Sequence, residues 1–362
     1  MRGTQIEIRP SALTHNARIA RQHAEHCELF AMVKANAYGH GIDVAWRAFA
    51  PVVDGFGVAV CDEAQQLRTL GCSHPIMVAE GFFDDQEWQL SEALGAEWAV
   101  HSAWQIKHII ASPLPAAVWI KVNTGMNRLG LPVIEVSPAV IALRAAGIEV
   151  RGLMTHFANA DEQDDVMSAT QLAAIEAIGH QHSLPLSCSN SAASLRYPAT
   201  HHHRVRPGIM LYGSSPFADR PATDFKLAVT HRFSARVIAL NHINRGDRVG
   251  YGGTWTADSP RLIAVVAVGY GDGYPRHAPS GTPVAIHGRR VPLVGRVSMD
   301  LITVDVTDIS VSVGDEVELW GDDVSVDEVA SHCGTISYEL FCQITSRPER
   351  IIAADKRAFT NG

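Results

Sequence analysis

The stretch LFAMVKANAYGHG, residues 29–41, holds the first residues whose types and order point to chemistry. Its apolar run, residues 29–33, predicts a buried strand, and Lys34 follows that strand directly. The chain has only five lysines, so one at the end of a buried strand requires a reason. It is either a solvated lysine, the ordinary interpretation, or an amine whose pKa is lowered by burial and nearby cations so that it forms Schiff bases.

Candidate site residues follow other apolar segments in the same way. Those at or just past such segments are Lys34, Lys121, Asn123, Arg128, His156, Asn190, Ser191, Arg206, Gly208 and Ile209. In a parallel barrel the carboxyl ends of all strands share one face, which carries the active site. The pairs at 190–191 and 208–209 fall where such barrels bind phosphate through backbone N–H groups. A Schiff-base lysine and a phosphate site together suggest pyridoxal phosphate as cofactor.

The elements that must position these residues alternate between strands and helices over the first two thirds of the chain. The predicted strands are 28–33, 54–60, 75–79, 97–100, 117–122, 149–154, 184–188 and 203–206. Helical apolar spacing lies between them, as at 42–50, 135–146 and 167–180. Eight strand–helix units favour an α/β fold of the (β/α)8 TIM-barrel type. A Rossmann sheet is the competing prediction, but no G-x-G-x-x-G follows the first strand.

A second domain begins near residue 226, where the pattern changes to short β-branched segments between Gly, Pro and Asp turns. The segments are 228–239, 261–268, 283–287, 291–297, 301–306 and 315–320. Ser325 and Glu328 have the spacing of a capping box for a short helix, and a second helix is predicted over 337–344. We therefore predict a barrel over residues 1–226 and a mainly-β domain over residues 227–362.

Composition excludes several classes of function. The 362 residues are 46% hydrophobic with a formal net charge of −8, and no basic block offers a surface for nucleic acid. No apolar run reaches the about 20 residues that span a bilayer, and the first residues do not resemble a signal peptide, so we expect a cytoplasmic protein without membrane partners. The six cysteines and eighteen histidines show no metal-ligand spacing, so we expect no metal.

The motif AMVKANAYGHG, residues 31–41, resembles the pyridoxal-phosphate lysine motif of the alanine racemase family. Eight more stretches resemble that family in its order: VNTGMNRLG (122–130), THFANAD (155–161), SNSAASLR (189–196), RPGIMLYG (206–213), VGYGGTW (249–255), GYGDGYPR (269–276), GRVSMD (295–300) and TISYE (335–339). The resemblance covers nearly the whole chain. It implies an N-terminal barrel, a C-terminal β domain and a head-to-tail homodimer.

The resemblance also implies a reaction, the interconversion of L-alanine and D-alanine through a pyridoxal-phosphate aldimine, for peptidoglycan synthesis or alanine catabolism. Lys34 would carry the cofactor and act as one base, and Tyr251 from the partner subunit would act as the other. His156 and Arg206 would stabilise the tyrosinate, whose unperturbed pKa near ~10 is otherwise too high for a base at neutral pH. Arg206 would also face the pyridine nitrogen and leave it unprotonated, which limits side reactions.

The remaining motif positions receive binding roles from the same resemblance. Residues expected at the cofactor are Lys34, Tyr38, His156, Asn190, Ser191, Arg206, Gly208, Ile209 and Tyr338. Arg128 and Met299 would bind the substrate carboxylate, and Tyr270 and Tyr274 would line a narrow entrance. In many relatives the lysine matching Lys121 is carboxylated and positions the arginine, and the sequence alone permits either a plain or a carboxylated Lys121.

Three alternatives stay open at this point. A racemase for another amino acid, such as serine or lysine, would use the same scaffold, because sequence does not give the volume of a pocket. A non-catalytic pyridoxal-phosphate carrier would need only the barrel, and Tyr251 with its β domain argues against it. A decarboxylase would place an acid where Arg206 stands.

Overall fold

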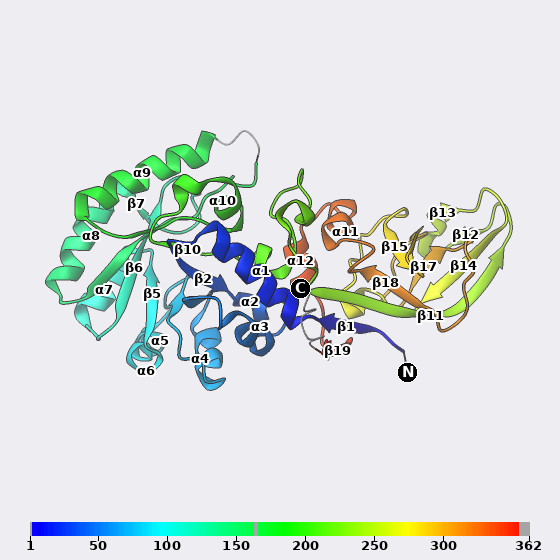
Figure 1. Ribbon diagram of the computed structural model, residues 1–362, viewed down its shortest axis with the longest axis horizontal. Helices are drawn as coiled ribbons and strands as arrows, with labels where there is room; N and C mark the ends of the chain where they lie inside the picture. Colours follow the sequence, from blue (N-terminus) through cyan, green and yellow to red (C-terminus); the bar gives the residue numbers. More distant parts are fainter. Residues whose placement is uncertain (1, 163–165, 355–362) are drawn as a thin grey trace, which may run out of the picture. The chain divides into compact units, whose positions relative to one another are not determined.

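The computed structural model describes residues 2–162 and 166–354, which divide into two units (Figure 1). The first unit, Leu13–Ala228, is built on eight parallel strands. They are β2 (Glu28–Met32), β3 (Gly55–Val58), β4 (Ile76–Val78), β5 (Ala96–Val100), β6 (Ala117–Asn123), β8 (Glu149–Met154), β9 (Leu186–Ser187) and β10 (Arg204–Val205). Each pairs with the next, and β10 pairs with β2, so the sheet closes into a ring. The predicted barrel and its eight strands are confirmed.

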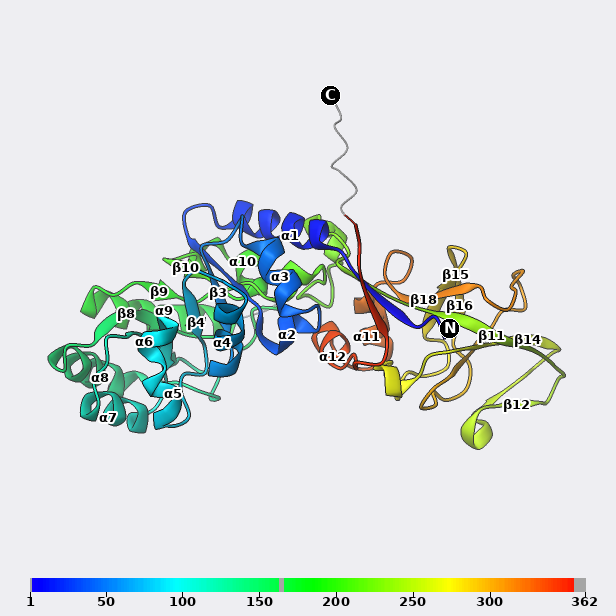
Figure 2. The same ribbon diagram turned by 90° about the horizontal axis from the view of Figure 1, so that it is seen from below.

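Helices lie outside this ring of strands, as Figures 1 and 2 both show. The longer ones are α3 (Ile42–Phe49), α4 (Cys61–Thr69), α7 (Ala103–Ala111), α8 (Val133–Ala145) and α9 (Val166–His182), and shorter ones are α5 (Asp85–Gln89), α6 (Ser91–Leu94) and α10 (Ser191–Arg196). Helix α1 (Pro10–His23) begins just before the first residue of this unit and belongs mostly to it. Short elements between them are β7 (Leu131–Pro132), η1 (Pro198–Thr200), η2 (Ile209–Tyr212) and η3 (Ala222–Phe225).

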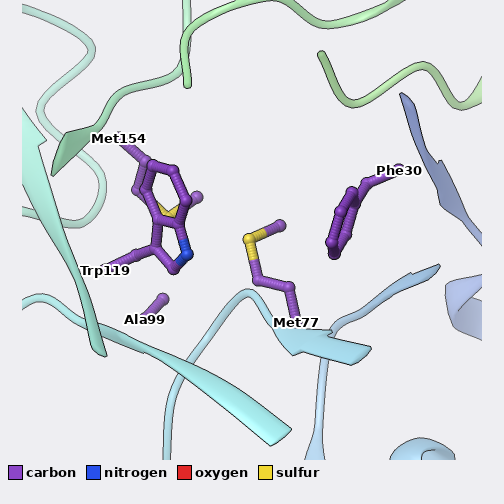
Figure 3. Close-up of a cluster of buried hydrophobic side chains, with 5 residues drawn as sticks. All are labelled: Phe30, Met77, Ala99, Trp119 and Met154. Carbon is purple, nitrogen blue, oxygen red and sulfur yellow. The ribbon is translucent and has the colours of Figure 1, made fainter. Parts of the chain in front are cut away.

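The barrel interior is filled by side chains from alternate positions of its strands. Phe30, Met77, Ala99, Trp119 and Met154 form one buried cluster and come from five different strands (Figure 3). Burying a large apolar side chain contributes about 1.5–3 kcal/mol, so this layer is a substantial part of what keeps the ring closed. The filled interior leaves the carboxyl ends of the strands, hereafter the mouth, as the place for a site.

The second unit comprises Met1–Ala12 and Val229–Gly362, within which residues 2–12 and 229–354 are described. Its strands are β1 (Gln5–Ile8), β11 (His231–Ile243), β12 (Arg248–Val249), β13 (Trp255–Thr256), β14 (Arg261–Val266), β15 (Pro283–Ile286), β16 (Arg289–Pro292), β17 (Ile302–Asp305), β18 (Glu316–Trp320) and β19 (Glu349–Ile352). Its helices are η4 (Tyr251–Gly253), η5 (Tyr270–Asp272), α11 (Val326–His332) and α12 (Ser337–Cys342). The Ser325 hydroxyl accepts a hydrogen bond from the Glu328 N–H, so the predicted cap of α11 is present.

The division into units differs from the prediction at the start of the chain. We predicted a barrel from residue 1 to 226, but β1 belongs to the β unit, where it pairs antiparallel with β11 and parallel with β19. The physical reason is burial, because Ile6 and Ile8 alternate with polar residues and are fully buried in that sheet. None of the described helices combines the length and the apolar character that crossing a bilayer requires.

Candidate active site

Lys34 lies directly past β2, at the mouth of the barrel, in an unusual segment of backbone. The segment α2 (Lys34–Tyr38) is a left-handed turn, with φ of 52°, 52°, 54° and 51° at Ala35, Asn36, Ala37 and Tyr38. This conformation costs roughly 1–2 kcal/mol for each residue other than glycine, so the turn stores several kcal/mol. Backbone strain of this size persists only where the surroundings hold it, and it concentrates at functional sites.

Tyr38, at the far end of the turn, is fixed by aromatic packing. Its ring stacks on Tyr212 with centroids 4.6 Å apart, and the Tyr212 hydroxyl donates a hydrogen bond of 2.8 Å to the Met32 carbonyl of β2. A Cβ atom on Gly208 would lie 2.4 Å from the Tyr38 Oη. The hydroxyl therefore lies directly against the backbone of residue 208, which has to be glycine.

Ser191 joins the same group of polar atoms. Its Oγ accepts hydrogen bonds from the backbone N–H groups of Gly208, at 2.8 Å, and Met210, at 3.3 Å. Ile209 lies between those two residues and begins η2. We call the Tyr38 and Ser191 hydroxyls with the backbone of residues 208–210 the polar cradle. Hydroxyl and amide donors of this kind suit a phosphate dianion.

Asn190 precedes Ser191 and has a structural task. Its side-chain oxygen accepts a hydrogen bond of 3.0 Å from the Ala193 N–H and so caps α10, which begins at Ser191. The cap fixes the position of Ser191. The contact with a cofactor that we predicted for Asn190 stays a prediction.

Arg206 brings a buried positive charge to the mouth. Its guanidinium donates to two neutral oxygens, the Ser187 hydroxyl and the Thr155 carbonyl, and burial lowers its pKa to about 10, which leaves it protonated at neutral pH. His156 follows Thr155. Burial, and then the charges of Arg206 and Arg128, hold the pKa of His156 well below its ordinary value, so the imidazole is neutral.

Lys121 and Arg128 complete this cationic group. They line one cavity together with Thr155 and His156. The Lys121 amine is buried and donates to the Ala79 carbonyl at 3.2 Å. Burial, with the charges of Arg206 and Arg128, lowers its pKa to about 8. The fold therefore brings together the residues that sequence predicted at strands five, six and eight.

The chemistry available at the mouth is that of a site for an anion. Four positive side chains from three strand ends surround a neutral histidine, and the polar cradle adds donors without full charge. The guanidinium of Arg206 has five N–H donors, and its described partners are two neutral oxygens, so donors remain for an uncharged ring nitrogen. Pyridoxal phosphate, with its phosphate, its ring nitrogen and its need for an amine, fits these residues.

A larger hollow lies at the opposite, amino ends of the barrel strands. It is lined by Arg68, Glu97, Glu149 and Arg151, among others, and by none of the predicted site residues. Its buried carboxylate, Glu97, is already paired with Arg204 and accepts a hydrogen bond from the Trp119 indole. Size alone therefore does not identify the site. The cationic group at the mouth does, because none of its members forms an ion pair within residues 2–162 and 166–354.

The predicted residues of the β unit are mostly on its surface. Tyr251 is the first residue of η4, which follows β12, and 69% of its surface is exposed. Met299 and Tyr270 are also exposed, and Tyr338 is half-buried on α12. Glycines at 250, 252 and 253 with positive φ shape the Tyr251 turn. The roles predicted for these four residues stay predictions.

Tyr274 does not have the position we predicted. Its side chain is 1% exposed, and its ring stacks on Trp320 of β18 with centroids 6.2 Å apart. A residue in the core of the β unit cannot line an entrance, so this prediction is wrong. The motif GYGDGYPR gave no means of telling its buried tyrosine from Tyr270, the exposed one.

Two groups of residues escaped the sequence reasoning. Glu63 binds the backbone N–H of Ala35, in the left-handed turn, at 2.6 Å. In the β unit, Asp272 is a buried carboxylate that binds the guanidinium groups of Arg2 and Arg347. A glutamate at the third position of a helix, such as Glu63, is a sequence signal for helix capping. Nothing in the sequence indicates that Asp272 binds the two arginines.

Comparison with known proteins gives one consistent result. The family model described as alanine racemase, N-terminal domain, matches residues 8–216, and the one described as alanine racemase, C-terminal domain, matches residues 230–352. The alanine racemase of Alcanivorax borkumensis is 59% identical over 352 residues, which cover 97% of this chain and 100% of the relative.

Solved structures agree with the sequence relatives. The crystal structure of the biosynthetic alanine racemase of Pseudomonas aeruginosa superposes with a TM-score of 0.94 at 41% identity, covering 98% of this chain and 100% of the other. That of Bartonella henselae alanine racemase, which holds covalently bound pyridoxal phosphate, has a TM-score of 0.90 at 29% identity, covering 97% and 99%.

Proposed function

The chain belongs to the alanine racemase family, and from that membership we propose that it interconverts L-alanine and D-alanine at the mouth of its barrel. The observation that carries this proposal is the gathering of Lys34, the polar cradle and the buried Arg206 at one end of the strands. That combination of an amine, anion-binding donors and a guanidinium whose described partners are neutral suits a pyridoxal-phosphate racemase better than a pyridoxal-phosphate decarboxylase, which would place an acid at residue 206.

Each residue of the mouth then has a binding task toward pyridoxal phosphate. Lys34 would hold the cofactor through its Nζ, and the polar cradle, with Ile209, would hold the phosphate. Tyr338 would add a further hydroxyl. Arg206 would donate to the ring nitrogen. When bound, the cofactor withdraws electrons from the substrate and so makes the hydrogen on its α-carbon acidic.

Racemisation requires that a proton leave one face of the α-carbon and that another arrive on the opposite face. We assign these transfers to Lys34 Nζ and to the phenol oxygen of Tyr251 of the partner subunit. The high exposure of Tyr251 on its own chain supports a role in a second chain. Shared sites of this kind make a homodimer a requirement of the reaction rather than an addition to it.

The phenol of Tyr251 needs positive charge nearby to act as a base at neutral pH. His156 is a neutral imidazole beside Arg206, so it can accept a hydrogen bond on one ring nitrogen and donate on the other. We propose that His156 links the phenol to the guanidinium of Arg206, which stays charged throughout. These hydrogen bonds from arginine through histidine to tyrosine stabilise the phenolate, while the guanidinium keeps all its protons.

The substrate carboxylate would be bound by Arg128 and by the Met299 backbone N–H, with Tyr270 at the entrance. Lys121 lies in the same cavity as Arg128, where two positive charges repel. Its amine, with a pKa of about 8, is neutral often enough to attack carbon dioxide. Its Nζ would bond to the carbon and release one proton, which gives a carbamate anion. We propose that this carbamate positions Arg128.

Turnover by the purified protein tests the proposal. With pyridoxal phosphate added, L-alanine in deuterated water should become D-alanine and gain deuterium at the α-carbon, while L-serine and L-lysine react slowly. Faster turnover of serine would move the assignment to another racemase. A cofactor that borohydride traps on Lys34 without turnover of any amino acid would contradict the proposal and leave a cofactor carrier. A role in peptidoglycan synthesis or in alanine catabolism, and a cytoplasmic location, stay predictions.

A further inference from the structure

The left-handed turn that carries Lys34 is held at its start by a side chain from a different part of the barrel. The Glu63 Oε1 accepts a hydrogen bond of 2.6 Å from the backbone N–H of Ala35, the residue immediately after Lys34. Ala35 is also the first residue of the turn with a positive φ. The contact therefore acts where the backbone changes hand.

The other oxygen of Glu63 is already in use. Its Oε2 accepts hydrogen bonds from the backbone N–H groups of Ala59, at 2.8 Å, and Val60, at 3.4 Å. Val60 is the N-cap of α4 and Glu63 is its third residue, so this oxygen reaches back to the start of its own helix as in half of a capping box. One carboxylate thus connects the α4 terminus, which follows β3, with the turn that follows β2.

Glu63 stands at one end of the turn and the aromatic contact of Tyr38 at the other. Between them the turn closes its own hydrogen bonds, from the Ala37 N–H to the Val33 carbonyl at 2.9 Å and from the Gly39 N–H to the Ala35 carbonyl at 3.0 Å. These internal bonds repeat along any left-handed turn and do not choose its hand. The contacts with Glu63 and Tyr212 come from outside the turn, and these contacts select its left-handed form.

We propose that Glu63 is a positioning residue for Lys34, which sets the direction of the lysine by holding the Ala35 amide. The same turn delivers Tyr38 to Gly208, so Glu63 coordinates the amine and the polar cradle through one segment of backbone. This inference rests on the proposed function, because it gives Lys34 and the cradle their roles toward pyridoxal phosphate. Its physical content, the anchoring of the turn, is independent of any reaction.

The variant Glu63→Gln separates positioning from helix capping. A glutamine side chain has one acceptor oxygen, and glutamine serves as well as glutamate in a capping box. When that oxygen stays hydrogen-bonded to the α4 amides, the NH2 group of the glutamine faces the Ala35 N–H. Two donors cannot form a hydrogen bond, so the contact with the turn is lost. Asp62→Asn is the matched control, because Asp62 is the exposed neighbouring carboxylate of the same helix.

Hydrogen exchange of the peptide that spans residues 29–41, in protein without cofactor, is the first measurement. We expect the amides of residues 35–38 to exchange about tenfold faster in Glu63→Gln than in the wild type, with no change in Asp62→Asn. In the loaded protein we expect an about tenfold higher dissociation constant for pyridoxal phosphate and an about tenfold lower kcat, with KM for alanine little changed.

A rescue variant completes the test. Ala35→Gly removes the cost of positive φ at the residue that Glu63 holds, so the double variant Glu63→Gln with Ala35→Gly should regain most of the cofactor affinity. Unchanged exchange and cofactor binding in Glu63→Gln, or a loss of thermal stability without rescue, would show that Glu63 only caps α4 and would overturn the proposal. A wild type that binds no cofactor would refute the proposed function, whereas the exchange result would stand on its own.

Discussion

The guanidinium of Arg206 is a buried charge that influences how its neighbours titrate. Its field adds to burial in lowering the pKa of both His156 and Lys121. A neutral histidine and a partly neutral lysine are the forms that can accept protons and attack electrophiles. At this scale the site is specified by one arginine whose described partners are the neutral oxygens of Ser187 and Thr155.

Lys121 allows a test of this charge distribution through stability. Burial lowers its pKa to about 8, whereas an unfolded lysine keeps a value near ~10.4. Between these values the unfolded chain binds a proton that the folded chain does not, so the free energy of unfolding increases as pH rises from about 8 to about 10. We expect Lys121→Met to be more stable than the wild type by about 3 kcal/mol at pH 7, and the difference to vanish above about pH 10.

The measurement is denaturant unfolding of cofactor-free protein in buffers free of carbon dioxide. The control is Lys107→Met, which makes the same replacement at an exposed position of α7. A constant difference between Lys121→Met and the wild type across this range would mean that the amine is not held in its neutral form by the fold.

The left-handed turn contacts the start of η2 where the Tyr38 hydroxyl lies against Gly208. Gly208→Ala would put a methyl group 2.4 Å from the Tyr38 Oη, a distance at which one of them has to move. We expect the dissociation constant for pyridoxal phosphate, measured by absorption, to increase about tenfold or more, because displacing Tyr38 disturbs the polar cradle.

Tyr38→Phe provides the internal control for that variant. It removes the oxygen that the new methyl group would strike, so the double variant should lose less cofactor affinity than the sum of the two single variants. Strict additivity of the two losses would indicate that Gly208 is required for a reason other than Tyr38.

The element η5 of the β unit is anchored by Asp272. Its carboxylate binds Arg2 at 2.7 Å and Arg347 at 2.7 Å and accepts a hydrogen bond from the Gly269 N–H at 2.9 Å. Burial alone would raise the pKa of Asp272, but the two arginines and this N–H hold it below its ordinary value. The stabilisation is therefore complete above the unfolded pKa, near 3.8, and is lost as pH falls through the folded one.

Asp272→Asn should accordingly destabilise the protein by about 2–3 kcal/mol at pH 7, with the difference shrinking below about pH 4. Asp300→Asn removes an exposed carboxylate that also binds Arg347, and should cost no more than about 1 kcal/mol. Thermal unfolding across pH measures both. Equal effects of the two variants would show that burial of Asp272 contributes nothing.

The barrel strands were predictable from the sequence because they are apolar runs that end in polar residues.

Other elements were not predicted correctly. The segment 291–297 was predicted as one strand, but β16 ends at Pro292, because a proline cannot continue the ladder. The pairing of β1 with β19 escaped prediction because it joins residues from opposite ends of the chain. The left-handed turn escaped because alanine gives no signal for positive φ, and so its partner Glu63 escaped as well.

For the whole molecule, the two units contribute different parts of the proposed site. The barrel holds Lys34 with its binding residues, and the β unit presents Tyr251 on a glycine-shaped turn at its surface. We assign the tyrosine to the site of a second chain. Each chain of a homodimer would then be inactive by itself, and each site would contain residues from both chains.

A hybrid dimer tests this claim most directly. One chain carries Lys34→Ala and the other Tyr251→Phe, and two purification tags isolate the mixed dimer. If Tyr251 serves the partner, one of the two sites keeps both bases, and the hybrid should racemise alanine at about half the wild-type rate per dimer. If Tyr251 serves its own chain, every site lacks one base, and activity no higher than that of either parent variant would contradict the shared site.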